Sequence, residues 1–140
     1  MNCWLLQNDC LESPPDNTYG FVYCIINKRD GRIYVGKKAF TFRKKKVLSK
    51  KARLVANTRK RTAITAVDSK WQKYWGSSKP LLEDVKTLGE KNFERRILGF
   101  ARNKSELSYL EVHWQIQMKV LHVPSYNGWI SCKIYRKHLS

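Results

Sequence analysis

The sequence predicts a small α+β domain, in which a three-stranded mixed or antiparallel sheet is flanked by helices. Its 140 residues suit one domain and are too few for two independent cores. Apolar and aromatic residues make up 42% of the chain, which is enough to fill one core. Strand-like and helix-like segments follow in the order β-β-(α)-α-β-α without an internal repeat. This order is typical of a sheet with helices packed on it.

The first two strands are expected to form a hairpin. Residues 19–27 (YGFVYCIIN) are a continuous β-branched and aromatic run, which indicates a buried strand. Residues 28–31 (KRDG) predict a turn, because Asp-Gly readily supplies the positive φ that a hairpin needs. Residues 32–38 (RIYVGKK) then return as the second strand.

Helix signals follow in two places. Residues 50–56 contain helix formers, but their apolar positions are too sparse to set boundaries. A helix over residues 79–88 is better defined, since Ser77 or Ser78 can cap its start and Gly89 can end it.

The last predicted elements are a strand over residues 92–101 and a helix that starts at Asn103 or Ser105 and runs to about Val120. Apolar residues lie on two opposite sides of this helix, so we expect both sides to be covered. Glu111 lies at the edge of one apolar stripe. A buried carboxylate is costly unless it is paired or binds a metal or a proton. The alternative is a glutamate that reaches solvent or meets a Lys or Arg.

The charge of the chain is concentrated in one segment. There are 28 Lys and Arg against 11 Asp and Glu, a net charge of +17, and no acidic residue occurs from Gly31 to Val67. A block of one sign favours an anionic partner, and nucleic acid is the obvious one; a localisation signal or solubility are the alternatives. The predicted DNA-binding residues are Lys38, Lys44, Lys45, Lys46, Lys50, Lys51, Arg53, Arg59, Lys60 and Arg61.

The cysteines and the hydropathy indicate the cellular compartment in which we expect the protein. The four cysteines, Cys3, Cys10, Cys24 and Cys132, lack CxxC spacing, so neither a zinc site nor a disulfide framework is expected, and Cys24 is predicted to be a core residue. No apolar run approaches the roughly 20 residues that span a bilayer, and no secretory signal is evident. We therefore expect a cytoplasmic protein in a reducing compartment, with no membrane partner.

Several catalytic motifs are missing from the sequence. It contains no HExxH, no His-Asn-His spacing, no paired-carboxylate motif for two metals and no Gly-rich phosphate loop. These absences argue against zinc proteases, two-metal nucleases and ATP-driven enzymes.

Two tripeptides in the predicted hairpin carry a family resemblance. Residues 21–23 (FVY) and 34–36 (YVG) stand where the GIY-YIG nuclease family has its two motifs, although Phe21 replaces the first glycine and Gly20 lies one place early. Further matches follow in order. These are YWGSSK at 74–79 and LGEKNFE at 88–94, which resemble the phage and homing-type branch, then EVHW at 111–114 and Tyr126-Asn127. The resemblance covers about residues 19–128.

The resemblance implies a metal-dependent DNA endonuclease. Glu111 would hold Mg²⁺ or Mn²⁺, and the positive charge would stabilise the transition state at the scissile phosphate. Tyr23 and Tyr34 would present hydroxyls to the attacking water, one of them as general base, with its pKa lowered by nearby cations. Asn127 would orient the site through its amide.

Two residues are candidates for the cation that holds the phosphate. The family places an arginine seven to eight residues after the second motif, where this sequence has Arg43. The basic insertion makes that alignment loose, and Lys37, directly after the motif, could do the same work.

The predicted organisation is an N-terminal arm over 1–18, a nuclease domain over 19–128 with a basic insertion at about 37–67, and a basic C-terminal segment over 129–140. The resemblance suggests a phage-encoded homing or interference enzyme in a bacterial host, or a restriction enzyme, acting on double-stranded DNA in an undetermined oligomeric state. The alternative is a catalytically inactive nucleic-acid-binding protein, associated with RNA or ribosomes, on the same scaffold.

Overall fold

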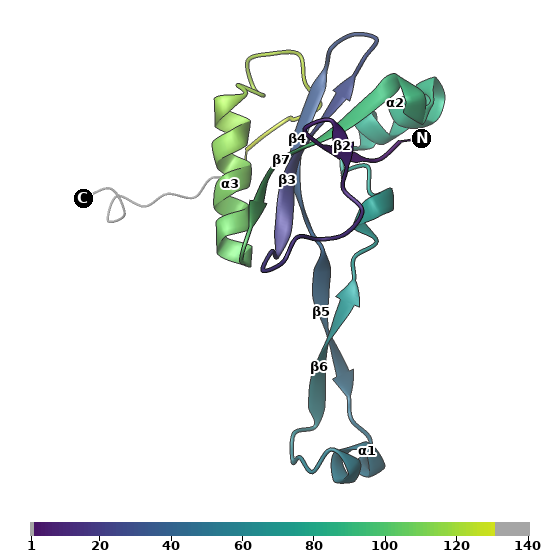
Figure 1. Ribbon diagram of the computed structural model, residues 1–140, viewed down its shortest axis with the longest axis vertical. Helices are drawn as coiled ribbons and strands as arrows, with labels where there is room; N and C mark the ends of the chain where they lie inside the picture. Colours follow the sequence, from purple (N-terminus) through teal and green to yellow (C-terminus); the bar gives the residue numbers. More distant parts are fainter. Residues whose placement is uncertain (1, 131–140) are drawn as a thin grey trace, which may run out of the picture.

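A five-stranded sheet forms the centre of the computed structural model, which describes residues 2–130 (Figure 1). The strand order is β2-β1-β7-β3-β4; β3 is antiparallel to both of its neighbours, and β1 is parallel to β7. The α+β class is confirmed, but the sheet has five strands instead of the predicted three. The strands are β1 (Trp4–Leu6), β2 (Asp9–Cys10), β3 (Gly20–Asn27), β4 (Ile33–Ala39) and β7 (Phe93–Ala101).

The two additional strands come from the N-terminal residues. In the parallel pairing of β1 with β7, Trp4 lies opposite Arg95. Trp4 is 1% exposed, and its indole N–H donates to the Trp71 carbonyl oxygen at 2.7 Å. Strands of three and two residues are too short to show a hydrophobic period, which explains why the sequence did not predict them.

The predicted β3–β4 hairpin is confirmed, and β3 is a central strand buried on both faces. Alternate residues of β3 serve two cores: Phe21 and Tyr23 belong to one cluster, and Val22 and Cys24 to the other. Helix α3 (Lys104–Gln117) packs on the second cluster, on one face of the sheet. Helix α2 (Lys79–Leu88) lies on the opposite face, with the first cluster (Figure 1). Two 3₁₀ turns, η1 (Trp71–Lys73) and η2 (Glu90–Asn92), flank α2 in the chain. None of the helices in this described part is long and apolar enough to cross a bilayer.

Helix α3 differs from its prediction in two ways. It ends at Gln117, three residues early, and Lys119 follows in a left-handed conformation with φ of 53°. Only one side of α3 is covered: Tyr109 and Ile116, on the side expected to be a second buried stripe, are 70% and 58% exposed. The prediction of cover on both sides was therefore wrong.

The basic insertion forms a projection that we name the arm, residues 41–68. Strands β5 (Thr41–Val47) and β6 (Thr62–Asp68) pair only with each other, with Arg43 opposite Ala66. Helix α1 (Lys50–Val55) lies at the far end, where Ser49 caps it. Figure 1 shows the arm extending away from the five-stranded sheet.

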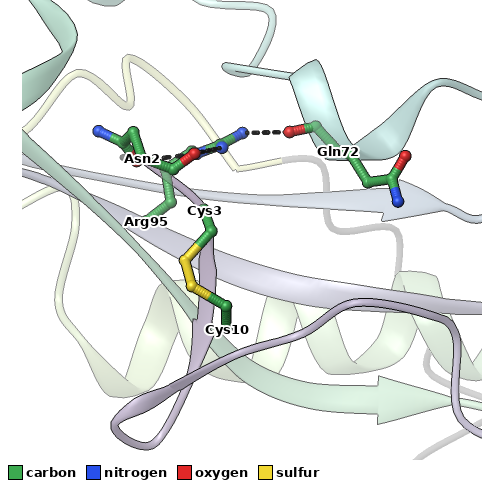
Figure 2. The surroundings of a disulfide bond; sticks show 5 residues. All are labelled: Asn2, Cys3, Cys10, Gln72 and Arg95. Atoms are coloured by element: carbon green, nitrogen blue, oxygen red, sulfur yellow. Dashed lines mark hydrogen bonds between the residues drawn. A yellow bond between two sulfur atoms is a disulfide. The ribbon is translucent and has the colours of Figure 1, made fainter.

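A disulfide joins Cys3 to Cys10 across the turn between β1 and β2. The expectation that these cysteines are unpaired was wrong: the short antiparallel pairing brings their Cα atoms to 5.7 Å, within bonding range. Figure 2 shows Arg95 beside this bond, where its guanidinium donates to the Gln72 carbonyl and to Asn2.

Arg95 is buried and holds the segment 72–74, which precedes α2, in place through hydrogen bonds. Besides Gln72, it donates to the Tyr74 carbonyl at 2.8 Å, and its guanidinium lies between the rings of Trp4 and Trp75. Burial lowers the pKa of Arg95 to about 10. The N-terminal strand therefore helps to place Tyr74, which contacts Tyr23.

The free thiol of Cys24 provides a test of the packing in the second cluster, which α3 covers. Burial raises the pKa of Cys24 to about 12, so at pH 8 only about one molecule in 10⁴ carries the reactive thiolate. We expect iodoacetamide to leave Cys24 unmodified in the native protein and to modify it in guanidinium, as measured by peptide mass mapping. Rapid labelling of the native protein would contradict the described packing.

Candidate active site

One cavity of about 690 Å³ brings together four of the predicted site residues, Tyr34, Lys37, Glu111 and Asn127. It lies where β4, α3, the start of α2 and the segment 126–129 meet. The complete lining is Tyr34, Lys37, Ser77, Ser78, Lys79, Pro80, Glu111, Gln115, Tyr126, Asn127, Gly128 and Trp129.

Glu111 is a largely desolvated carboxylate in this cavity. Its side chain is 19% exposed, and the Lys37 ammonium lies 3.9 Å from Oε1. Lys37 also donates a hydrogen bond to Ser108 Oγ at 2.9 Å. Burial raises the pKa of Glu111, and Lys37 partly opposes this rise. The ion pair is long and shared with Ser108, so both groups can change partners when a ligand enters.

The donor set fits a hard divalent cation. Among the described residues no three His, Cys, Asp or Glu side chains gather to form a metal cage, as a structural zinc site would require. Mg²⁺ and Mn²⁺ can be held by a single carboxylate when waters and phosphate oxygens complete the coordination. Glu111 faces a cavity that is large enough for a phosphate and is lined in part by Lys37, Ser77 and Lys79, so it meets this requirement.

The two predicted tyrosines lie in different environments. Tyr34 lines the cavity, and its hydroxyl lies 3.2 Å from Ser77 Oγ. Tyr23 is 1% exposed, is not part of the lining, and hydrogen-bonds through its hydroxyl to Tyr74. Burial raises the pKa of both tyrosines. The prediction that cations lower it is therefore wrong for the free protein, because the groups that act on both tyrosines are Tyr74 and Glu111.

Gly36 explains why the second motif ends in glycine. It lies opposite Tyr23 in the β3–β4 pairing. A Cβ atom at Gly36 would lie 2.6 Å from the Tyr23 hydroxyl oxygen and 3.0 Å from Cε2 of Tyr34. Any side chain here would push the two tyrosines out of place.

Asn127 is occupied with the backbone of Val35 on the edge strand β4. Its Oδ1 accepts from the Val35 N–H at 2.9 Å, and its Nδ2 donates to the Val35 carbonyl at 2.9 Å. Gln115 Nε2 donates to the same carbonyl at 3.1 Å. These bonds fix β4 against the segment 126–129 and α3, so the amide of Asn127 holds the cavity wall.

Arg43 is not brought to the cavity. It lies on β5 in the arm with an exposed side chain, because the chain continues from β4 into a projecting strand. Of the two candidate cations, only Lys37 lines the cavity.

The predicted DNA-binding residues lie mainly on the arm. Lys38, the exception, lies one residue before the end of β4, and its ammonium is 4.2 Å from the centre of the Tyr74 ring. Arg53 is partly exposed, and the side chains of Lys44 and Lys46 lie outside the described part of the chain. The predicted DNA-binding residues with exposed side chains are Lys45, Lys50, Lys51, Arg59, Lys60 and Arg61.

The cavity also contains residues that sequence reasoning did not assign to the site. Ser77 and Lys79 belong to the segment 74–79 that carried the resemblance, and their place before α2 was a usable signal. Gln115 lies one helical turn after Glu111, a spacing that puts both on one face. Trp129, 73% exposed, follows Asn127 without any pattern to mark it.

Tyr34 and Lys37 on a sheet edge, Glu111 on the facing helix and Asn127 are thus brought to one cavity, as the resemblance to GIY-YIG nucleases implied. A family model described as "Putative endonuclease segE, GIY-YIG domain" matches residues 4–131, and the chain belongs to this family. Comparison with curated proteins and with solved structures gives no match. Membership supports a nuclease function and therefore a nucleic-acid substrate.

Proposed function

We propose that the protein is a metal-dependent DNA endonuclease that hydrolyses phosphodiester bonds, with Glu111 as the metal ligand. The observation that carries the proposal is the meeting of Glu111, Lys37 and Tyr34 in one cavity whose wall Asn127 holds. A carboxylate, a cation and a hydroxyl are the groups that phosphodiester hydrolysis needs in one place.

Lys37 is the residue we assign to the scissile phosphate. In the free protein its ammonium faces Glu111 at 3.9 Å. A bound divalent ion would supply positive charge to the phosphate and lower the pKa of a bound water. With Glu111 so engaged, Lys37 is free to contact a non-bridging oxygen. Lys79 and the start of α2, which has no acidic residue in its first turn, add positive potential to the same wall.

Tyr34 is the residue we assign to the attacking water. Its hydroxyl reaches the cavity, and Ser77 lies beside it. Because burial raises its pKa, Tyr34 is neutral at pH 7 and positions the water by hydrogen bonding. We assign the buried Tyr23 to support of Tyr34, its neighbour at 6.2 Å between ring centres.

Double-stranded DNA is the substrate we propose, in the phage homing or interference setting that the resemblance suggests. The arm supports a duplex partner because its exposed Lys and Arg side chains lie in a stretch, residues 31–67, without an acidic residue, and because the arm extends away from the five-stranded sheet (Figure 1). The inactive alternative rests on the departure at Phe21 and on the lack of a clear catalytic arginine. Phe21 is fully buried in the aromatic core and does not line the cavity, so this departure leaves the proposed chemistry intact. Lys37, which lines the cavity, supplies a cation in place of the arginine.

Incubation of purified protein with supercoiled plasmid tests this function. We expect nicked or linear DNA with 5′-phosphate and 3′-hydroxyl ends in Mg²⁺ or Mn²⁺, and intact plasmid in EDTA. Binding without cleavage in every metal tested would favour the inactive alternative.

The arm is expected to bind DNA without contributing to the chemical step. Changing Arg43 and Lys45 together to alanine should weaken binding to all sequences alike and reduce the slope of log K against log salt by up to about 0.9 for each lost phosphate contact. The measurement is fluorescence anisotropy over a salt series, with Lys86→Ala/Lys104→Ala as a control of equal charge. A lower single-turnover rate at saturating protein would instead indicate that Arg43 takes part in the catalytic step.

A further inference from the structure

The far end of the arm is both strongly basic and apolar. Val47, Leu54 and Val55 are 79%, 77% and 84% exposed, the highest values among the large apolar side chains of the described residues. Helix α1 has no buried residue, so these side chains cover no core. Exposed aliphatic side chains at the end of a projection are costly in water and indicate a surface that becomes buried in a complex.

The surroundings of these side chains favour a polyanion as the partner. Lys50, Arg53 and Arg59, together with Leu54 and Thr58, line a cavity of about 240 Å³. The Nε atom of Arg53 is buried and has no hydrogen-bond partner among the described residues. No acidic residue occurs from Gly31 to Val67, so the stretch that carries the three cations contains no carboxylate. Such a cavity suits a phosphate group.

DNA offers apolar surface beside phosphates at the faces of its stacked base pairs, which an inserted side chain reaches from a groove. We propose that Leu54 and Val55 form a wedge that enters the minor groove and opens one base step, bending the duplex, while Lys50, Arg53 and Arg59 hold the flanking phosphates. Proteins that bend DNA in this way insert aliphatic side chains and recover the cost of unstacking through contacts along the bent duplex. The inference rests on the proposed function, because it takes duplex DNA as the substrate.

The position of the arm places the wedge at a limited distance from the cut. Lys37 lines the cavity, and Val47 follows ten residues later along an extended chain. At about 3.3 Å per residue, Val47 lies no more than roughly 33 Å from Lys37, and helix α1 carries the wedge beyond that point. A length of about 33 Å corresponds to about ten base pairs at 3.4 Å each. The wedge should therefore select flexible pyrimidine–purine steps about one helical turn, or slightly more, from the scissile bond.

The experiment measures bending apart from cleavage. A Glu111→Gln protein, which should not cut, is mixed in Mg²⁺ with a 30-base-pair duplex carrying a dye at each end and 2-aminopurine at a TA step. We expect energy transfer and 2-aminopurine fluorescence both to rise on binding. Adding Leu54→Ala/Val55→Ala should abolish both signals, with a loss of affinity of no more than about tenfold, whereas Ile116→Ala/Leu121→Ala, which removes two exposed aliphatic side chains elsewhere, should keep them.

Several results would overturn the wedge. One is equal bending by the tip variant and its parent. Another is a change from dimer to monomer in sedimentation caused by the tip variant, which would make the tip a contact between copies of the chain. Cleavage by the unmodified protein without bending would refute the wedge and leave the nuclease standing. Bending without cleavage in any metal would refute the nuclease and leave the wedge. Failure to bind duplex DNA would refute both.

Discussion

Replacing Glu111 by glutamine is expected to abolish cleavage while DNA binding persists. The change keeps the size of the side chain and removes the one carboxylate of the cavity lining. Loss of metal-derived charge stabilisation costs several kcal/mol in the transition state, so the single-turnover rate should fall by more than about 10³-fold. Affinity for DNA in EDTA should stay equal or rise, because a negative charge that faces phosphate is lost.

Glu106→Gln is the matched control for this change. Glu106 lies on the same helix, pairs with Arg102 and is absent from the cavity lining, so the substitution has the same effect on net charge. Mn²⁺ binding, followed by electron paramagnetic resonance, should be lost in Glu111→Gln and kept in Glu106→Gln. A Glu111→Gln protein that nicks plasmid at the unmodified rate would exclude Glu111 as the ligand.

The elements with strong local patterns were predictable from the sequence. The β3–β4 hairpin shows a continuous apolar run and an Asp-Gly turn, and α2 shows Ser78 before it and Gly89 after it. Each signal acts within a few residues and needs no partner from elsewhere. The position of Glu111 at the edge of an apolar stripe is a local signal of the same kind, since it shows in the helical period, whereas its role in the site stays a prediction.

The features that were missed depend on contacts distant in the sequence. Strand β1 exists because it pairs with β7, about 90 residues away, and the Cys3–Cys10 bond depends on the turn that follows β1. The exposed side of α3 looks apolar in sequence and has no layer above it among the described residues. Arg43 sits at the expected interval, but pairing of β5 with β6 carries it into the arm. Sequence spacing alone cannot show such displacements.

The two hairpin tyrosines are expected to respond differently to loss of the hydroxyl. Tyr34→Phe keeps the ring and removes the group that reaches the cavity, so the single-turnover rate should fall by about 10²–10⁴-fold, the usual scale for a positioned proton-transfer or hydrogen-bonding group. Among residues 2–130, the Tyr34 hydroxyl bonds only to Ser77, at the surface, so the melting temperature should change little.

Tyr23→Phe should show the opposite result, with a larger loss of stability and a smaller loss of cleavage rate than Tyr34→Phe. Its buried hydroxyl is lost together with the hydrogen bond to the half-buried Tyr74, at a cost of about 0.5–1.5 kcal/mol in the free energy of unfolding. A 140-residue chain should then melt several degrees lower, while the rate falls less than in Tyr34→Phe because Tyr23 does not line the cavity. Melting temperature and single-turnover rate, measured on both variants at saturating Mg²⁺, separate the two roles. Should Tyr23→Phe lose more activity than Tyr34→Phe at equal stability, the attacking water lies with Tyr23, and the cavity must open toward the core when DNA binds.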